Sequence, residues 1–400
     1  MSEQKKIKQL PVFTTQGHAG QLTRESQYVF NYQTSDKDCE IALTMPLRAN
    51  SYTGSILPGV LRQNLPEGFL YDWIKTHFGK VVKKLDDMAI LGIAGRNTIG
   101  RVHCIDGADQ ATNASSESLN TLLTWKGTES LFAELSERFA ALSGISGIQP
   151  KVLLSATDDT PETSKDVIEK VSMKERQFII KSSGDDFPDL AENEHICMSI
   201  AAKAKLDVPR FWLSDNRKLF VVERFDVRQG QYLGFEDMTA LMNKQNDEKY
   251  NGSYEQIAKA ITLFASPEHK QSSLELLFAT LALSILVRNG DAHLKNFGML
   301  YTHPHTDDAR LSPIYDIVTT TAYLPKDILA LNLNKSKAWP TRQTLIEFGK
   351  AHCNLDHPEH IAERIADAAM EYRPDESSDI WQTMKPIIDL ACFEYASKKT

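Results

Sequence analysis

The segment "LVRNGDAHLKNFGMLY" (residues 286–301) combines side chains whose types and spacing suit phosphoryl transfer. Asp291 and Asn296 form the pattern D-x-x-x-x-N inside an otherwise apolar run. A carboxylate there can orient an attacking hydroxyl, and the amide oxygen can hold a magnesium ion on the transferring phosphate. Polar groups in apolar surroundings must be solvated, paired or in use. The segment is therefore a candidate catalytic loop, although a polar loop that merely follows a helix would also explain it if it stood alone.

A second carboxylate for the metal follows in "LSPIYDIV", which contains Asp316. In protein kinases the magnesium ligands are the asparagine of the catalytic loop and an aspartate that follows it in the sequence, and Asn296 and Asp316 have this order. The apolar neighbours predict that Asp316 lies in a strand-like run, where an unpartnered acid is costly but a magnesium ligand is not. A strand-end aspartate at a turn is the alternative.

Lys181 ends the short apolar stretch "FIIK", and the next predicted helix offers Glu192 and Glu194. Kinases use a strand lysine that binds the α- and β-phosphates and pairs with a helix glutamate. We expect Glu194 to be that partner, because it shares a helical stripe with Cys197 and Ala201. A lysine at a strand edge with its ammonium in solvent is the alternative.

Two further stretches suit nucleotide binding. "LFVVERFDV" is typical of the strand that leaves a kinase N-lobe, so the backbone of Glu223, Arg224 and Phe225 could hydrogen-bond an adenine; any half-buried strand is the alternative. "SGISGIQPK" (residues 143–151) lies between a predicted helix and a strand, where backbone amides could cradle phosphate. It matches neither a Walker A loop nor G-x-G-x-x-G, and an ordinary turn is the alternative.

One rival constellation points to metal-dependent hydrolysis instead. "YTHPHTDD" holds His303, His305, Asp307 and Asp308, close to the H-x-H-x-D-H pattern of metallohydrolases. Its last position is an aspartate, and the segment lies between "FGMLY" and "ARLSPIY", which suit the two strands of a hairpin. We therefore predict that it is a hydrophilic hairpin tip.

The composition indicates a folded soluble protein, with 42% hydrophobic and 24% charged residues in 400. A net charge of −8 gives no indication of direct nucleic-acid binding. No run approaches the roughly 18 apolar residues of a membrane span, and the first residues contain no signal-peptide core. Five widely spaced cysteines without a C-x-x-C pair are expected to be reduced thiols in a cytoplasmic protein, without structural zinc.

Periodicity predicts an α+β, two-lobed, protein-kinase-like fold with a small β-rich N-terminal subdomain. The predicted elements are a strand in "QYVFNYQT", a loop over 106–118, a hairpin over 210–227 and helices over about 67–78, 129–142, 190–206 and 273–289. We place three parts at 1–138 (the N-terminal subdomain and a connecting helix), 139–232 (the N-lobe) and 233–400 (a helical C-lobe).

The quoted motifs together resemble those of the HipA family of bacterial toxin kinases, over nearly the whole chain. "ALTMPLRANSY", "LRQNLPEGF" and "LGIAGRNTIGRV" are similar to the small domain that precedes the kinase in this family. "ISGIQPK", "NEHICM", "VVERFDV", "NGDAHLKNFGML", "LSPIYDIVTTTAY" and "LALNLN" are similar to its core motifs, in the same order. As a set they are highly specific, whereas no single one is.

The resemblance implies a role for each matching residue. Asp291 would be catalytic, Lys181 would hold the triphosphate, and Asn296 and Asp316 would bind Mg²⁺. His293 and Lys295 would lie beside the phosphates. The remaining implied ATP contacts are the phosphate loop Ile145, Ser146, Gly147, Ile148 and Gln149, and the adenine hinge Glu223, Arg224 and Phe225.

One position departs from the family pattern. Family members commonly carry an autophosphorylated serine where this chain has Gly144. Self-modification is therefore either lost here or passes to Ser146, with Ser143 as a further candidate.

The resulting hypothesis is a Mg²⁺- and ATP-dependent serine/threonine protein kinase that acts as the toxin of a toxin–antitoxin module. The resemblance implies a protein substrate, such as an aminoacyl-tRNA synthetase, and a helix-turn-helix antitoxin similar to HipB through which DNA is reached. Two alternatives stay open: a small-molecule or lipid kinase, whose loops also use Asp-x-His-x-x-Asn, and a non-catalytic regulator on an antitoxin–DNA complex.

Overall fold

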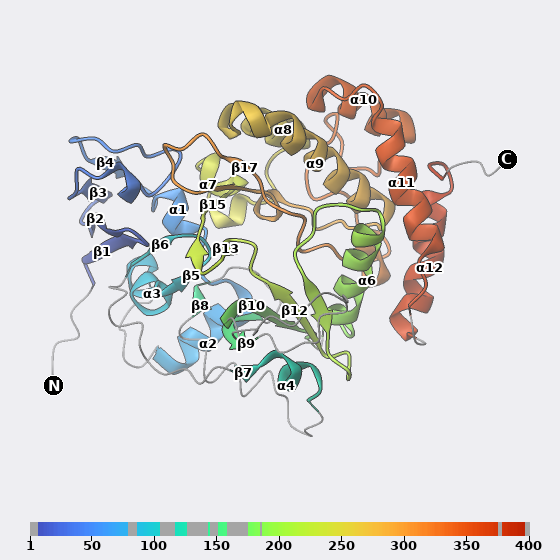
Figure 1. Cartoon of the computed structure of the whole chain (residues 1–400), viewed down its shortest axis with the longest axis horizontal. Helices are drawn as coiled ribbons and strands as arrows, with labels where there is room; N and C mark the ends of the chain where they lie inside the picture. The colour runs from blue at the N-terminus through green and yellow to red at the C-terminus, as the bar shows by residue number, and fades with distance from the viewer. Residues whose placement is uncertain are drawn as a thin grey trace, which may run out of the picture.

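The computed structural model describes residues 7–78, 86–104, 117–125, 143–144, 151–157, 175–184, 186–374 and 378–396. Figure 1 shows a β-rich N-terminal region at one side, a central sheet with helix α6, and a helical C-terminal part at the other side. This arrangement confirms the predicted α+β architecture with a small β-rich N-terminal subdomain. None of the helices within these ranges is both long and apolar enough to cross a membrane.

The N-terminal region is built on an antiparallel sheet in the order β4-β3-β2-β1-β6. Alternating side chains of its strands point inward, so Val12, Leu22 and Phe30 are fully buried. The elements are β1 (Gln9–Thr14), β2 (Gly17–Arg24), β3 (Tyr28–Tyr32), β4 (Tyr52–Gly54), α1 (Gly59–Arg62), α2 (Gly68–Phe78), α3 (Asp87–Ala94), β5 (Asn97–Thr98) and β6 (Val102–His103). Helices α1 and α3 contribute further buried residues to this core, whereas the buried residues of α2 pack against Leu153 of the next sheet.

A second five-stranded sheet, in the order β11-β12-β10-β9-β7, forms the N-lobe. Its antiparallel register places Lys151 of β9 directly opposite Lys181 of β10. Helix α6 packs against this sheet and contributes Glu194. The elements are β7 (Glu117–Ser118), α4 (Leu119–Leu123), β8 (Ser143–Gly144), β9 (Lys151–Thr157), β10 (Glu175–Ser182), α6 (Leu190–Lys203), β11 (Phe211–Leu213) and β12 (Leu219–Glu223).

The C-lobe surrounds helix α9 (Pro267–Leu286), which is buried from Ser273 onward except at Glu275 and Leu276. A three-stranded sheet, β15-β16-β17, carries the loops that follow α9. The other elements are β13 (Val227–Arg228), β14 (Gln231–Tyr232), β15 (Gly234–Asp237), α7 (Met238–Leu241), α8 (Tyr254–Phe264), β16 (Gly298–Tyr301), β17 (Arg310–Leu311), α10 (Arg342–Cys353), α11 (Pro358–Glu371) and α12 (Asp379–Cys392).

Most predicted elements within the described ranges are confirmed: β3, α2, α6, the β11–β12 hairpin and α9. The predicted helix at 129–142 and most of the loop at 106–118 lie outside the described residues, as does the predicted domain boundary at 138. The prediction that Asp316 lies in a strand-like run is wrong. The backbone there belongs to no strand, and Asp316 adopts a left-handed conformation with φ of 62°. Aspartate tolerates this region better than most residues, and such backbone is often found at functional sites.

A buried arginine joins the N-terminal region to the N-lobe. Arg224 is 1% exposed, and its guanidinium donates hydrogen bonds to Asn97 Oδ1 at 3.0 Å, Thr98 O at 2.7 Å and both Asp226 oxygens. Strand β5, which contains Asn97 and Thr98, pairs in parallel with β8. Arg224 therefore fixes the strand that in turn holds Ser143–Gly144.

Removing Arg224 should destabilise the protein strongly. In Arg224→Met the buried Asp226 carboxylate loses its counter-ion, and breaking a buried pair by removing one partner costs about 3–5 kcal/mol. Denaturant unfolding measures this loss. The exposed Arg228 offers a matched control, because Arg228→Met should change the free energy of unfolding by less than about 0.5 kcal/mol. Equal, small effects of the two variants would contradict the structural role of Arg224.

Candidate active site

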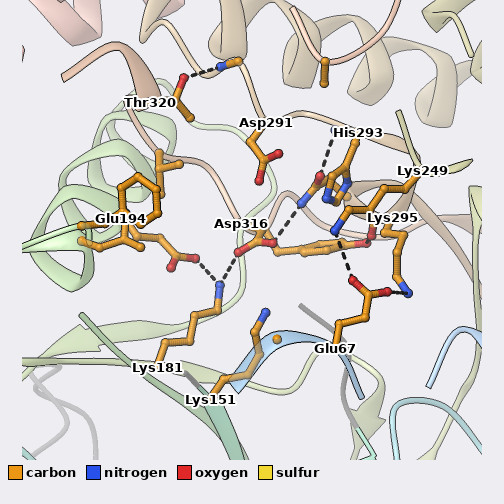
Figure 2. Close-up of a pocket in the computed structure, with 18 of the residues that line it drawn as sticks. Glu67, Lys151, Lys181, Glu194, Lys249, Asp291, His293, Lys295, Asp316 and Thr320 are labelled. Atoms are coloured by element: carbon orange, nitrogen blue, oxygen red, sulfur yellow. Dashed lines mark hydrogen bonds and ion pairs between the residues drawn. The ribbon is translucent and has the colours of Figure 1, made fainter. Parts of the chain in front are cut away.

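A cavity of about 860 Å³ opens between the N-terminal region, the N-lobe sheet and the C-lobe, and Figure 2 shows side chains that line it. The five residues on which the kinase interpretation depends all line this cavity: Lys181, Glu194, Asp291, Asn296 and Asp316. They come from a strand, a helix and two loops that are far apart in the chain. The size suits a nucleotide-sized ligand.

Lys181 lies at the centre of the site. Its ammonium is 2.5 Å from Glu194 Oε1 and 2.6 Å from Asp316 Oδ1, and its side chain is only 5% exposed. Burial alone would lower the pKa of Lys181, but the charges of Asp316 and Glu194 raise it above its ordinary value. The other candidate, Glu192, pairs instead with Arg217 at 2.6 Å.

The two acids respond differently to this environment. Burial raises the pKa of Glu194 to about 6, against the lowering effect of Lys181. Burial would also raise the pKa of Asp316, but the charges of Lys181 and Lys151 hold it well below its usual range. Asp316 is therefore an anion at any physiological pH, as a metal ligand must be.

Lys151 is a site residue that sequence reasoning did not single out. It is 7% exposed, burial lowers its pKa, and both it and Lys181 reach into the cavity in Figure 2. Like charges directly opposite each other on paired strands are destabilising. A multiply charged anion in the cavity, such as a triphosphate, would offset this repulsion. The only sequence signal was its place at the end of "SGISGIQPK".

Asp291 follows α9 and is held by its neighbours. The Tyr250 hydroxyl donates to Asp291 Oδ1 at 2.7 Å, and the Asp291 amide donates to Asn289 Oδ1 at 3.0 Å. Burial raises the pKa of Asp291 to about 6, and the hydrogen bond from Tyr250 opposes that rise. The hydrogen bond from Tyr250 fixes Oδ1 of Asp291, so Oδ2 could accept a hydrogen bond from a substrate hydroxyl.

The residue before Asp291 must be glycine. A Cβ on Gly290 would lie 2.1 Å from Asp327 Oδ2 and 2.6 Å from Ile328 O, which are impossible contacts. The Gly290 amide donates to Thr320 Oγ1 at 2.8 Å, and the Thr320 hydroxyl lies 2.5 Å from Asp327 Oδ2. The segment after Asp316 is thus packed directly against the loop that carries Asp291.

Asn296 and Asp316 lie side by side at the position predicted for the metal. Asn296 Nδ2 donates to Asp316 Oδ2 at 2.9 Å, while its oxygen accepts from the His293 amide at 2.9 Å. A metal ion between the two would take the amide oxygen, so the amide must turn over when a metal binds. The carboxylate and amide oxygens are the hard ligands that Mg²⁺ prefers. Glu194 Oε2 is also buried without a hydrogen-bond partner among the described residues. The residues therefore fit a magnesium nucleotide.

His293 and Lys295, expected beside the phosphates, both line the cavity. Burial lowers the pKa of His293 to about 3, so the ring is neutral at pH 7. The Lys295 ammonium lies 3.3 Å from Glu67 Oε1 and 3.2 Å from Gln63 O. Lys295 thus contacts the N-terminal region in this conformation.

In the expected adenine-binding segment, two backbone amides already donate hydrogen bonds within the protein. The Glu223 amide donates to Arg210 O and the Arg224 amide to Gln177 O, both at 2.9 Å. The Arg224 side chain points into the domain junction, whereas Glu223 and Phe225 line the cavity. The adenine role stays a prediction. The predicted phosphate loop, Ile145 to Gln149 with Ser146, lies outside the described residues.

The rival histidine-rich segment forms the tip of the β16–β17 hairpin, as predicted. Asp308 accepts hydrogen bonds from the Thr302 amide at 3.0 Å and the Thr306 hydroxyl at 2.6 Å, which closes the turn. Elsewhere, three side chains of types that can bind a metal lie close together, namely the exposed His357 and His360 and the half-buried Glu359.

The two-lobed fold and the lysine–carboxylate site define a kinase-like protein. The chain belongs to the HipA family. The model of the HipA-like C-terminal domain matches residues 143–373, and that of the HipA N-terminal domain matches residues 10–105.

Individual relatives agree with this assignment. A predicted kinase of Haemophilus influenzae is 33% identical over 194 residues, which is 45% of this chain and 53% of that protein. The predicted kinase Y4dM of Sinorhizobium fredii is 28% identical over 176 residues, 40% of this chain and 42% of that protein. The chain thus matches about half the length of these curated relatives.

A solved structure shows the same fold. It is a chain from the HipA, HipB and operator DNA complex of a Shewanella oneidensis MR-1 toxin–antitoxin system. The similarity covers 96% of this chain and 97% of that chain, with a TM-score of 0.66 and 16% sequence identity.

Replacing Lys181 should cost stability in a pH-dependent way. Lys181→Met leaves two carboxylates without their shared cation, so we expect a loss of about 3–5 kcal/mol at pH 8. Without Lys181 the folded-state pKa of Glu194 rises further above the unfolded value, so folding takes up a proton and acid pH favours the folded state. The deficit should therefore shrink between pH 8 and pH 5 in denaturant unfolding. Lys203→Met, at an exposed lysine, is the control; a Lys181→Met deficit independent of pH would refute this explanation.

Proposed function

We propose that this protein is a Mg²⁺- and ATP-dependent serine/threonine protein kinase that acts as the toxin of a toxin–antitoxin system. The observation that carries the proposal is the Lys181 ammonium bridging Glu194 and Asp316, with Asn296 beside Asp316 and Asp291 in the same cavity. If the Lys181 ion pairs served only to stabilise the fold, there would be no reason for Asp291 and Asn296 to line the same cavity.

The geometry supports a role for each of these residues. Lys181 and Lys151 would neutralise the triphosphate, and Asn296 and Asp316 would hold the magnesium ion that screens its charge. Asp291, fixed through one oxygen by Tyr250, would orient the hydroxyl of a protein serine or threonine with the other. The loops that carry Asp291, Asn296 and Asp316 are packed against each other. The acceleration of phosphoryl transfer would therefore come from positioning and charge stabilisation.

The biological setting is proposed from the family. The Shewanella oneidensis chain comes from a complex with HipB and operator DNA, which supports a helix-turn-helix antitoxin as partner for this protein. The net charge of −8 favours contact with DNA through that partner rather than directly. We propose a cytoplasmic protein target, with an aminoacyl-tRNA synthetase as the candidate implied by the family. Autophosphorylation at Ser146 or Ser143 also stays a proposal.

Asp291→Asn should abolish phosphoryl transfer without abolishing nucleotide binding. Losing a positioned base typically costs about 10²–10⁴-fold in rate. The assay offers labelled ATP and Mg²⁺ with cell lysate and follows label on protein, while calorimetry measures the affinity for Mg·ATP. Asp307→Asn, at the exposed hairpin tip, is the control and should keep the wild-type rate. Transfer at the wild-type rate by Asp291→Asn would refute the assigned role, and label on small molecules alone would favour a small-molecule kinase.

Tyr250→Phe should move the acid side of the pH–rate profile to higher pH. The hydroxyl stabilises the charged form of Asp291, and a hydrogen bond to a charged group contributes about 1.5 kcal/mol or more, or about one pKa unit. The wild-type profile should fall below about pH 6, the pKa to which burial raises Asp291. In the variant, kcat/KM should fall more at pH 6 than at pH 8. Tyr52→Phe, in the N-terminal sheet, should leave the profile unchanged; an unshifted Tyr250→Phe profile would rule out the contact as functional.

A further inference from the structure

Two lysines beside the catalytic loop share one carboxylate from the N-terminal region. Lys249 Nζ is 3.1 Å from Glu67 Oε2, and Lys295 Nζ is 3.3 Å from Glu67 Oε1 (Figure 2). The two lysine side chains are only 9% and 10% exposed, and that of Glu67 is 20% exposed. All three line the same cavity as Asp291.

Glu67 is the carboxylate that contacts both lysines of this cluster. Two ammonium groups face one bridging carboxylate, and the next acid, Asp237, is 4.0 Å from Lys295. The remaining partners of Lys295 are neutral: the Gln63 carbonyl and Asn246 Oδ1. Burying two ammonium groups is costly unless their charge is compensated. A group with more than one negative charge would interact with both ammonium groups more strongly than the single charge of Glu67 does.

The cluster lies within electrostatic reach of the catalytic residues. Burial is the main reason for the low pKa of His293, and the next is the positive charge of Lys249. The same charge lowers the pKa of Asp291, against its rise on burial. In Figure 2 the side chain of Lys249 lies next to His293, and Glu67 faces it from below. An anion on Lys249 would therefore be close to where Asp291 holds the attacking hydroxyl.

We propose that Lys249 and Lys295 form a second anion site, which takes the γ-phosphoryl group during transfer, and that Glu67 occupies this site until the phosphate replaces it. The proposal rests on the kinase function proposed above. The Glu67 carboxylate oxygens stand where two phosphate oxygens would bind. A phosphoryl group carries more charge and three oxygens, and charge-assisted hydrogen bonds of this kind are the strong ones.

The fold allows Glu67 to leave without moving the N-terminal region. The segment before it is fixed: Gln63 Nε2 donates to Phe235 O at 2.7 Å, and Asn64 Nδ2 donates to Ile99 O at 3.1 Å. Gly68, which follows, has a φ of 52°, a turn that places the Glu67 side chain over the cavity before α2 begins. The proposed exchange therefore requires the Glu67 side chain to move, whereas the segment before it keeps its contacts.

Comparing nucleotides with and without a γ-phosphate tests the proposal. Calorimetry would measure the affinities for Mg·AMP-PNP, a non-hydrolysable ATP analogue, and for Mg·ADP. Glu67→Gln removes the competing charge, so it should bind Mg·AMP-PNP about five- to tenfold more tightly and leave Mg·ADP within about twofold. Lys249→Gln should weaken Mg·AMP-PNP by about tenfold and spare Mg·ADP. Glu25→Gln, at an exposed acid of the same region, is the control and should change neither.

Each outcome decides between the two proposals. If the wild-type protein binds neither nucleotide, the kinase function itself fails. If it binds both, but Glu67→Gln leaves the preference for Mg·AMP-PNP unchanged or weakens it, Glu67 only positions the lysines and the present inference is overturned. In the double variant Glu67→Gln/Lys249→Gln, most of the gain from Glu67→Gln should disappear, because the two residues act on the same anion. If Glu67→Gln does not fold, Glu67→Asp, which shortens the reach but keeps the charge, should still favour Mg·AMP-PNP.

Discussion

The site depends on one cation, the Lys181 ammonium, held between two carboxylates in a nearly dry environment. Glu194 belongs to the N-lobe helix α6 and Asp316 to a C-lobe loop, so a single charge joins both lobes. Separating such a pair leaves uncompensated charge at low dielectric, which is expensive. The lobes are therefore held together at this point, and the groups proposed to bind Mg·ATP line one cavity.

The N-terminal region is part of this arrangement and not an appendage. It is attached through Arg224 to the N-lobe, and through Glu236 to the C-lobe, where the Leu43 amide and the Tyr301 hydroxyl both donate to Glu236 Oε1. Burial raises the pKa of Glu236 to about 7. Both anchors are buried, and they hold the region where Glu67 contacts Lys249 and Lys295. The proposed phosphate site and the contacts of the N-terminal region thus share the same two lysines.

Local patterns predicted the elements and the residues whose partners are imposed by those elements. The helical stripe of α6 selected Glu194 over Glu192, and the ion pair with Lys181 agrees with that selection. Lys151, Lys249, Tyr250 and Glu67 were missed for a common reason. Each acquires meaning only from a partner brought near by folding, and none belongs to a spacing pattern that a single sequence displays.

The sequence by itself determined the buried helix α9, the loop that follows it with Gly290 before Asp291, and the order of the kinase-like residues. These features depend on neighbours a few positions away, where backbone geometry relates spacing to direction. Tertiary structure alone decided that Asp316 leaves its apparent strand with a φ of 62° and that Glu67 faces two lysines from another domain. Such contacts follow from how whole elements pack, because side-chain packing and charge compensation between distant segments can outweigh local preference.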